Sequence, residues 1–297
     1  MKNIYFDNAA TTKLDDEVLK EMLPYLKDNY GNPSSIYKLG REARKAIEDS
    51  REKIAKVLNC KANEIYFTAG GSESDNTAIK GIAKANKKRG NHIITSKIEH
   101  PAVLETCKQL EKEGFEITYI SVDEKGIVDL EELKKSIKPT TILITIMFAN
   151  NEIGTIQPIE EIGKIAKGNN IYFHTDSVQA VGSIKIDVQK LNIDSLSLSG
   201  HKFYGPKGVG ALYVKTGVPF EKFISGGHQE RNKRAGTENV AGIVGIGKAI
   251  ELAYENLDEY NKKIKELRDY YVKQVEEKIP YIKINGDMEK RLPGNSN

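Results

Sequence analysis

Short apolar, β-branched runs alternate with amphipathic helical patterns along most of the chain, and this alternation constrains the fold more than any other feature. The run over 142–148 is nearly all apolar, as expected for a strand that is covered on both faces. Such alternation is typical of βα units and a mostly parallel sheet, so we predict an α/β fold. The predicted strands cover 65–68, 93–96, 117–121, 142–148, 171–175, 195–199 and 209–214, and the predicted helices cover 15–28, 42–58, 74–88, 102–113, 130–137 and 159–167.

The last part of the chain carries a different pattern. A long helical pattern runs from residue 240 to about 279, where Pro280 ends it. A short strand is predicted over 281–284, and the chain then stops in residues typical of turns. We therefore expect an N-terminal arm over 1–14, a large domain over 15–250, and, over 251–297, a linking helix with the start of a small C-terminal domain whose remainder is absent. The helix is expected to pack on the rest of the chain through one apolar stripe, formed by Ile264, Leu267, Tyr271, Val275 and Ile279.

Charge and cysteine content narrow the classes of function. The net charge of +3 is too small to indicate binding of nucleic acid or of an acidic membrane surface. The two cysteines, Cys60 and Cys107, exclude a disulfide framework and fit a reducing cytosol. The N-terminus lacks the apolar core of a signal peptide, and the apolar run near 142–149 is too short to span a bilayer. We expect a cytoplasmic protein that contacts neither nucleic acid nor membrane directly.

Polar side chains gather directly after the predicted strands. In an open α/β sheet, ligands bind in the crevice beyond the carboxyl ends of the strands. The polar loops should therefore converge on one ligand site. They are 69–74, 99–101, 150–152, 174–179 and 199–202.

Two of these loops are suited to a phosphate group. Gly71 and Ser72 open a predicted helix, where backbone N–H groups, a hydroxyl and the positive end of the helix dipole meet. The alternative is a glycine turn in which Ser72 only caps the helix. Ser199 and His201 add a second hydroxyl and an imidazole at the same edge.

A lysine and an aspartate in these loops suggest a carbonyl cofactor. Lys202 follows an apolar strand, and burial there would lower its pKa, as a Schiff-base lysine requires. Asp176 could hold a protonated pyridine nitrogen, with Gln179 on the same rim. The alternatives are a surface lysine at a strand end and an aspartate that caps a helix.

His100 precedes Pro101, which places it in an extended or turn conformation just before a helix. It could cover the face of a ring and move protons. The competing interpretation is a metal site built from the chain's five histidines. No two of them have i,i+4 spacing and no HExxH motif occurs, so we expect no metal.

Seven segments resemble, in the same order, the motifs of the pyridoxal-phosphate-dependent cysteine desulfurases, which are class V aminotransferases. A single motif of this kind is weak, but seven in order over nearly the whole chain are highly specific. The segments are 5–12 (YFDNAATT), 68–76 (TAGGSESDN), 99–103 (EHPAV), 150–154 (NNEIG), 174–179 (HTDSVQ), 199–208 (SGHKFYGPKG) and 234–239 (RAGTEN).

The resemblance implies the aspartate-aminotransferase-like fold, fold type I of the pyridoxal phosphate enzymes, and a homodimer that shares its sites. It also implies a role for each matching residue. Lys202 would carry the cofactor covalently, Asp176 would pair with the ring nitrogen, Gln179 would bond the ring hydroxyl, and His100 would stack on the ring and transfer protons. Gly71, Ser72, Ser199 and His201 would hold the phosphate, Asn151 would lie between cofactor and substrate, and Thr237 would reach the phosphate in the neighbouring subunit.

The implied activity is removal of sulfur from L-cysteine, which leaves L-alanine and an enzyme persulfide for iron–sulfur cluster or thio-cofactor synthesis. The implied partner is a sulfur acceptor, either an iron–sulfur scaffold or a tRNA thiolation enzyme. Neither Cys60 nor Cys107 stands at the family's catalytic position, and the segment that carries the family's sulfur-accepting cysteine and its carboxylate-binding arginine is not among these 297 residues. We therefore expect this chain to bind the cofactor without transferring sulfur. The alternatives are a selenocysteine lyase or another fold-type-I lyase, and a non-catalytic cofactor-binding dimerisation fragment.

Overall fold

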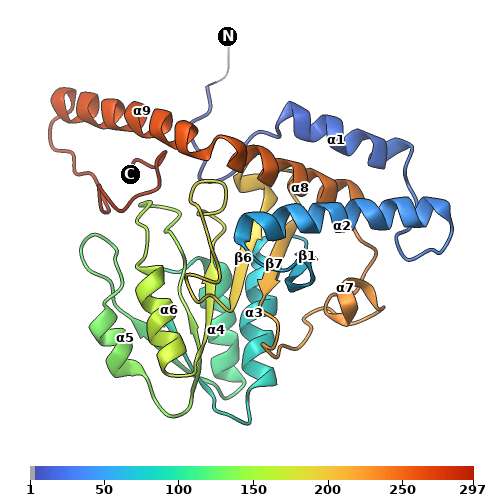
Figure 1. Cartoon of the computed structure of the whole chain (residues 1–297). Coiled ribbons are helices and arrows are strands. Elements are labelled where there is room, and N and C mark those ends of the chain that lie inside the picture. The colour runs from blue at the N-terminus through green and yellow to red at the C-terminus, as the bar shows by residue number, and fades with distance from the viewer. Residues whose placement is uncertain (1–3) are drawn as a thin grey trace.

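The computed structural model describes residues 4–297, so the first three residues of the predicted N-terminal arm lie outside the described residues. A seven-stranded sheet forms the centre, in the order β1-β7-β6-β5-β4-β2-β3 (Figure 1). Only β7 runs antiparallel to its neighbours, β1 and β6, which confirms the predicted α/β fold with a mostly parallel sheet. The strands are β1 Ile65–Thr68, β2 His92–Ser96, β3 Glu116–Ile120, β4 Thr141–Thr145, β5 Tyr172–Asp176, β6 Ser195–Ser199 and β7 Gly210–Val214.

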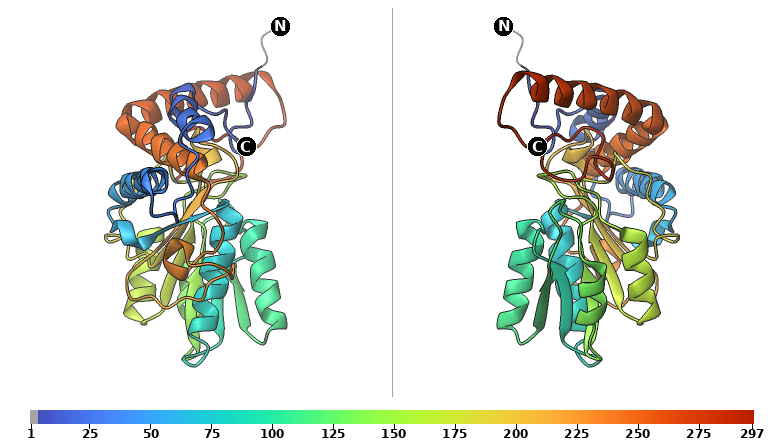
Figure 2. Two further views of the ribbon diagram at one scale, coloured as in Figure 1. Left: turned by 90° about the vertical axis from the view of Figure 1, so that its right-hand side faces the viewer. Right: turned by 90° about the vertical axis from the view of Figure 1, so that its left-hand side faces the viewer.

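Helices cover both faces of this sheet (Figure 2). Neighbouring strand residues such as Ile93 and Ile94 belong to different buried clusters, because successive side chains of a strand point to opposite faces. One cluster packs α2 (Lys38–Leu58), α5 (Leu130–Ser136), α6 (Ile159–Gly168) and α8 (Val240–Glu255) against the sheet. The other packs α3 (Gly71–Ala85) and α4 (Pro101–Lys112) against the opposite face. The remaining helical segments are α1 Asp16–Lys27, α7 Gln229–Asn232, α9 Leu257–Lys278 and the short 3-10 turns η1 Ala62–Glu64 and η2 Gly200–Lys202.

The predicted long C-terminal helix is two helices. Asn256 leaves the helical region, with φ −130° and ψ 34°, so α8 ends at Glu255 and α9 begins at Leu257. The boundary expected between residues 250 and 251 falls inside α8. Among residues 4–297, no helix is long and apolar enough to cross a membrane.

Two expectations for the C-terminal part are wrong. Leu267 and Tyr271 of the predicted apolar stripe are each 56% exposed, whereas Arg268 and Val272 are buried. Helix α9 turns this face toward the terminal segment, where the Arg268 guanidinium donates to the Leu292 carbonyl. The predicted strand over 281–284 does not form. Tyr281 has φ 62°, a left-handed conformation that a strand does not accommodate.

A buried ion pair fixes the segment between β7 and α8. The Arg51 guanidinium donates to both carboxylate oxygens of Glu230 at 2.8 Å, and the two side chains are 1% and 2% exposed. Glu230 also accepts the Phe67 N–H at 2.8 Å, which ties the segment to β1. Glu230, Arg231 and Asn232 all have positive φ, a costly run for residues other than glycine. The ion pair therefore stabilises a strained stretch of backbone.

We expect Glu230→Gln to lower the free energy of unfolding by about 3–5 kcal/mol, because it removes the buried anion of Arg51 and leaves this buried guanidinium only the part-exposed carboxylate of Glu48. Urea unfolding measures the change. Glu251→Gln is the matched control, since Glu251 pairs with Lys53 and Lys248 at the surface and its loss should cost at most about 1 kcal/mol. Equal effects of the two substitutions would show that the buried pair does not stabilise this segment.

Candidate functional site

Lys202 and Gln179 meet under the N-terminal arm. Lys202 ends η2, directly after β6, and its half-buried ammonium group donates to the carbonyls of Ala9 and Ala10, the latter at 2.8 Å. The amide of Gln179 donates to the same Ala9 carbonyl at 3.0 Å. Burial lowers the pKa of Lys202, although the carboxylates of Asp176, Asp7 and Glu152 oppose the shift. Arm residues thus hold the amine in place while its surroundings favour the neutral, nucleophilic form.

Asp176 is the last residue of β5 and is 7% exposed. Its Oδ1 accepts the Val178 N–H at 2.9 Å, so it caps a turn and not a helix. Burial raises the pKa of Asp176, while this N–H, His100 and Lys202 act in the opposite direction. Among residues 4–297 no cationic side chain hydrogen-bonds to this carboxyl group. A protonated ring nitrogen would supply the missing partner.

The beginning of α3 borders the candidate site beside the end of β6. The helix begins at Gly71, and Gly70 is its N-cap residue, so the interpretation of Ser72 as the cap is wrong. Gly70 has φ 151°, and a Cβ added at Gly71 would lie 2.6 Å from Cγ2 of Val178, so only glycine fits this contact. A Cβ at either glycine would lie 3.7 Å from the Ser199 side chain. The end of β6 therefore lies beside a helix N-terminus whose N–H groups are free to bind an anion.

His201 stands next to Lys202 and is fixed by the arm. Its Nδ1 lies 3.0 Å from the Thr11 hydroxyl, and its carbonyl accepts the N–H and the hydroxyl of Thr12. Burial and the neighbouring charges of Lys202 and Lys207 lower the pKa of His201. The ring is therefore neutral at neutral pH and can offer one N–H to an anion.

His100 and Asn151 follow β2 and β4, the strands on the other side of β5. The Nδ1 of His100 accepts the Ala102 N–H at 3.1 Å, which caps α4, and the rest of the ring is exposed. His100 is close enough to Asp176 to lower the pKa of that carboxyl group. Asn151 is half-buried and donates to Glu152 at 2.7 Å. Both residues therefore border the same edge of the sheet as Asp176.

Thr237 is the predicted site residue that the chain does not bring to the others. It lies between α7 and α8 and is exposed. Within residues 4–297 its side chain makes no hydrogen bond to the residues described above. The segment is joined to the first turn of α3 by Arg234, whose guanidinium donates to Glu73 at 2.9 Å.

The two cysteines take no part in the contacts described above. Cys60 follows α2 and is half-buried, and Cys107 lies inside α4 with no exposed surface. Burial raises the pKa of each thiol to about 12, so both are protonated at neutral pH. Over the described part of the chain, no three His, Cys, Asp or Glu side chains are grouped so that they could hold a metal ion.

Comparison with known families identifies the chain. A family model described as aminotransferase class-V matches residues 4–296. The chain belongs to the class V aminotransferases. Enzymes of this family use pyridoxal phosphate, in agreement with the cofactor predicted from the sequence motifs.

Named relatives place this class V aminotransferase among the cysteine desulfurases. It is 59% identical over 298 residues to "Cysteine desulfurase IscS" of Clostridium botulinum strain Hall, an alignment that covers 100% of this chain and 75% of the relative. It is 58% identical over 296 residues to the protein of the same name from Methanosarcina thermophila, covering 100% of this chain and 73% of the relative. The chain thus spans about three quarters of the length of these relatives.

Solved structures agree with the fold of this class V aminotransferase. A NifS-like protein with 46% sequence identity superposes with a TM-score of 0.95 over 98% of this chain and 80% of the other. A structure described as SspA in complex with cysteine, 45% identical, has a TM-score of 0.82 over 89% of this chain and 78% of the other. These matches confirm fold type I of the pyridoxal phosphate enzymes.

The residues present fit pyridoxal phosphate. Asp176 is a buried carboxyl group without a cationic hydrogen-bond partner, and the start of α3 offers N–H groups at a contact that a Cβ would fill. Lys202 supplies an amine between them and the arm. The contacts of the Ala9 and Ala10 carbonyls with Lys202 were not predictable from the sequence, because backbone groups leave no residue-type signal.

Proposed function

We propose that this class V aminotransferase carries the cofactor-binding part of a cysteine desulfurase: it binds pyridoxal phosphate through Lys202 for the removal of sulfur from L-cysteine, which leaves L-alanine, and the reaction also needs a thiolate that neither Cys60 nor Cys107 supplies. The observation that carries the proposal is the position of the Lys202 amine. It lies under the arm, beside buried Asp176 and the N-terminus of α3. The names of the relatives and the cysteine complex of a 45% identical protein support the choice of substrate.

Each side chain has one task in this proposal. When bound, pyridoxal phosphate supplies an electron sink that stabilises negative charge on the substrate Cα. Asp176 holds the proton on the ring nitrogen, Lys202 tethers the cofactor, and His100 covers the ring and moves protons. Gln179 bonds the ring hydroxyl, Asn151 lies between cofactor and substrate, and the phosphate is held by Gly71, Ser72, Ser199 and His201.

In the proposed reaction a cysteine thiolate attacks the substrate sulfur, so that an S–S bond forms while the substrate Cβ–S bond breaks and its electron pair stays on the substrate carbon, which takes up a proton to give alanine. The persulfide sulfur would then pass to an acceptor protein, an iron–sulfur scaffold or a tRNA thiolation enzyme. The two free cysteines of the chain fit a reducing cytoplasm for this chemistry. Assaying L-cysteine beside L-selenocysteine distinguishes the desulfurase from a selenocysteine lyase. Preference for selenocysteine would replace the proposed substrate.

We expect Asp176→Ala to weaken retention of pyridoxal phosphate about tenfold or more. A hydrogen bond to a charged group contributes roughly 1.5–3 kcal/mol, and this one forms at a buried site. Equilibrium dialysis measures retention, and exchange of the substrate Cα–H with solvent should slow in parallel. Asp258→Ala is the control, because the Asp258 side chain is 78% exposed. Unchanged retention and exchange in Asp176→Ala would refute the role of this carboxyl group.

We expect the cofactor-bound protein to be a homodimer in which Thr237 reaches the site of the neighbouring subunit. The exposed position of Thr237, apart from the other site residues of its own chain, supports this arrangement. Sedimentation of the chain loaded with cofactor should give a dimer, and Thr237→Ala should weaken retention without changing the mass. A monomer that holds its full complement of cofactor would contradict the shared site.

A further inference from the structure

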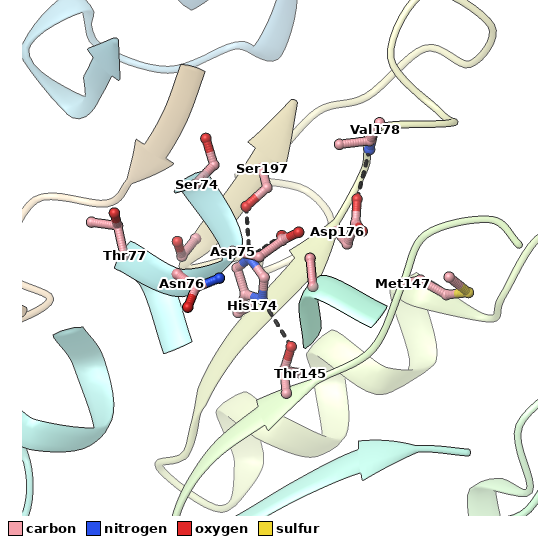
Figure 3. A network of polar contacts seen from close by, with 12 residues as sticks. Ser74, Asp75, Asn76, Thr77, Thr145, Met147, His174, Asp176, Val178 and Ser197 are labelled. Atoms are coloured by element: carbon pink, nitrogen blue, oxygen red, sulfur yellow. Dashed lines mark hydrogen bonds and ion pairs between the residues drawn. The ribbon is translucent and has the colours of Figure 1, made fainter. Parts of the chain in front are cut away.

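A second layer of polar side chains lies in the core beneath the candidate site. The ring of His174 contacts two hydroxyl groups: Nδ1 lies 2.8 Å from Oγ1 of Thr145, and Nε2 lies 3.0 Å from Oγ of Ser197. The same Nε2 lies 3.7 Å from Oδ1 of Asp75 (Figure 3). Each of these four residues is 1% exposed or less. The layer therefore has no contact with bulk water.

This layer lies on elements that also carry the candidate site residues, further from the carboxyl ends of the strands. His174 lies two residues before Asp176 on β5, and Ser197 lies two residues before Ser199 on β6. Residues two apart on a strand share a face of the sheet. Asp75 lies one helical turn after Gly71 on α3. The layer thus joins the three elements that carry the proposed phosphate and ring-nitrogen contacts.

His174 carries no charge at neutral pH. Both of its ring nitrogens face hydroxyl groups, which can donate to one nitrogen and accept from the other. Burial lowers the pKa of His174 to about 3. It therefore cannot act as a cationic partner for the neighbouring Asp75.

No cationic group among residues 4–297 acts on Asp75 to compensate a negative charge. Its Oδ1 has no hydrogen-bond partner among residues 4–297, and the charged groups that act on it, Asp176 and Glu99, are both acidic. Burial and these neighbours raise the pKa of Asp75, with a smaller opposing effect of the Ser197 hydroxyl. A buried carboxylate without a cation or full hydrogen bonding takes up a proton.

The charge of Asp176 acts on Asp75, and the surroundings of the two side chains decide which carboxyl group keeps the charge. Asp176 accepts the Val178 N–H, and its neighbours His100 and Lys202 lower its pKa. Asp75 has neither kind of support. Glu99, the third acid of the group, has its pKa raised to about 8 by burial, although Ser96 and the Met147 N–H donate to it. Asp176 is therefore the carboxyl group best able to ionise.

We propose that Asp75 carries a proton and His174 does not at neutral pH, so that an uncharged layer supports the site and Asp176 remains its single anion toward the ring nitrogen. Asp75 and His174 are then positioning residues that hold α3, β5 and β6 in register without adding charge. This inference rests on the proposed function of Asp176.

Replacing Asp75 and Asp176 in turn with asparagine tests the proposal. Asn is a neutral isostere of a protonated aspartate, so Asp75→Asn should change the Kd for pyridoxal phosphate by less than about threefold. Asp176→Asn should raise the Kd about tenfold or more, because it removes a charged acceptor. A loss in Asp75→Asn as large as that in Asp176→Asn would overturn the neutral layer. If neither substitution changed the Kd, the proposed role of Asp176 would fail as well.

The protonation of Asp75 can be measured without the cofactor. In the unaltered chain with aspartate labelled by ¹³C at the carboxyl carbon, NMR at pH 7 should show a protonated carboxyl signal. That signal should persist in Asp176→Asn and be absent from Asp75→Asn. If the unaltered chain shows no protonated aspartate at pH 7, the proposal is wrong, even where Asp75→Asn fails to fold.

The stability of the fold should also depend on the protonation of Asp75. A carboxyl group whose pKa is raised on folding stabilises the fold below its unfolded pKa and loses that stabilisation as pH rises toward its folded pKa. Unfolding midpoints of the cofactor-free chain should therefore fall between pH 5 and pH 8, and the fall should be smaller in Asp75→Asn. Identical pH dependence in the two chains would contradict a protonated Asp75.

Discussion

Replacing Lys202 with alanine should abolish covalent attachment of pyridoxal phosphate. Lys202 offers a half-buried amine with a lowered pKa, held by the Ala9 and Ala10 carbonyls beside Asp176. The groups in contact with the same arm residues cannot replace it, since the adjacent His201 is fixed to Thr11 and the amide of Gln179 is not nucleophilic. The unaltered chain should be yellow and keep its colour through gel filtration. The variant should lose the colour on the same column.

The matched control is Lys207→Ala. Lys207 lies five residues further on, in the same motif, and is exposed. It should leave covalent attachment unchanged, although it contributes to the lowered pKa of His201. Noncovalent retention in Lys202→Ala should survive in part, because the phosphate and ring contacts come from other elements. Full covalent attachment in Lys202→Ala would exclude this lysine from the site.

The second large effect concerns sulfur transfer. We expect the 297-residue chain to bind the cofactor and to release almost no alanine or sulfide from L-cysteine. Transfer of the substrate sulfur requires a thiolate placed at that sulfur atom. Cys107 is fully buried inside α4 and Cys60 follows α2, and burial raises the pKa of both thiols to about 12. Neither can supply that thiolate from its present position.

A chimera tests the expectation that this chain alone does not transfer sulfur. The curated Clostridium botulinum relative has a further quarter of its length beyond the aligned region, and these residues can be fused to the present chain. Alanine release from L-cysteine with a thiol reductant should rise by orders of magnitude in the chimera and should not depend on Cys60 or Cys107. If the 297-residue chain already matched the chimera, and Cys60→Ala or Cys107→Ala abolished that activity, one of these cysteines would be the sulfur acceptor.

The strands and helices were predictable from local sequence patterns in the part of the chain where they alternate. Every predicted strand up to residue 214 overlaps an observed one, and the nearly continuous apolar run that predicted β4 is typical of a strand buried on both faces. The direction of β7 was not predictable, since its residues are equally apolar in either orientation. The break at Asn256 and the left-handed Tyr281 depend on how α9 folds back on the terminal segment, which the helical periodicity does not encode.

The candidate site was predictable at the strand ends and not below them. Asp176, Ser199 and Lys202 stand where polar residues interrupt apolar strands, which is a signal that sequence shows directly. Asp75 lies in the polar first turns of α3 and His174 lies in the middle of β5, and their pairing across the core requires the three-dimensional fold. The sequence signal that could have pointed to this layer was a polar residue two positions before a predicted site residue, as His174 is before Asp176.

Borohydride reduction of the unaltered chain with pyridoxal phosphate, followed by peptide mapping, tests the central claim most directly. Reduction makes the attachment permanent and marks one lysine. We expect the pyridoxyl group on Lys202 alone, within the peptide that carries the motif over 199–208. A pyridoxyl group on any other lysine, or none on Lys202, would contradict the site described above.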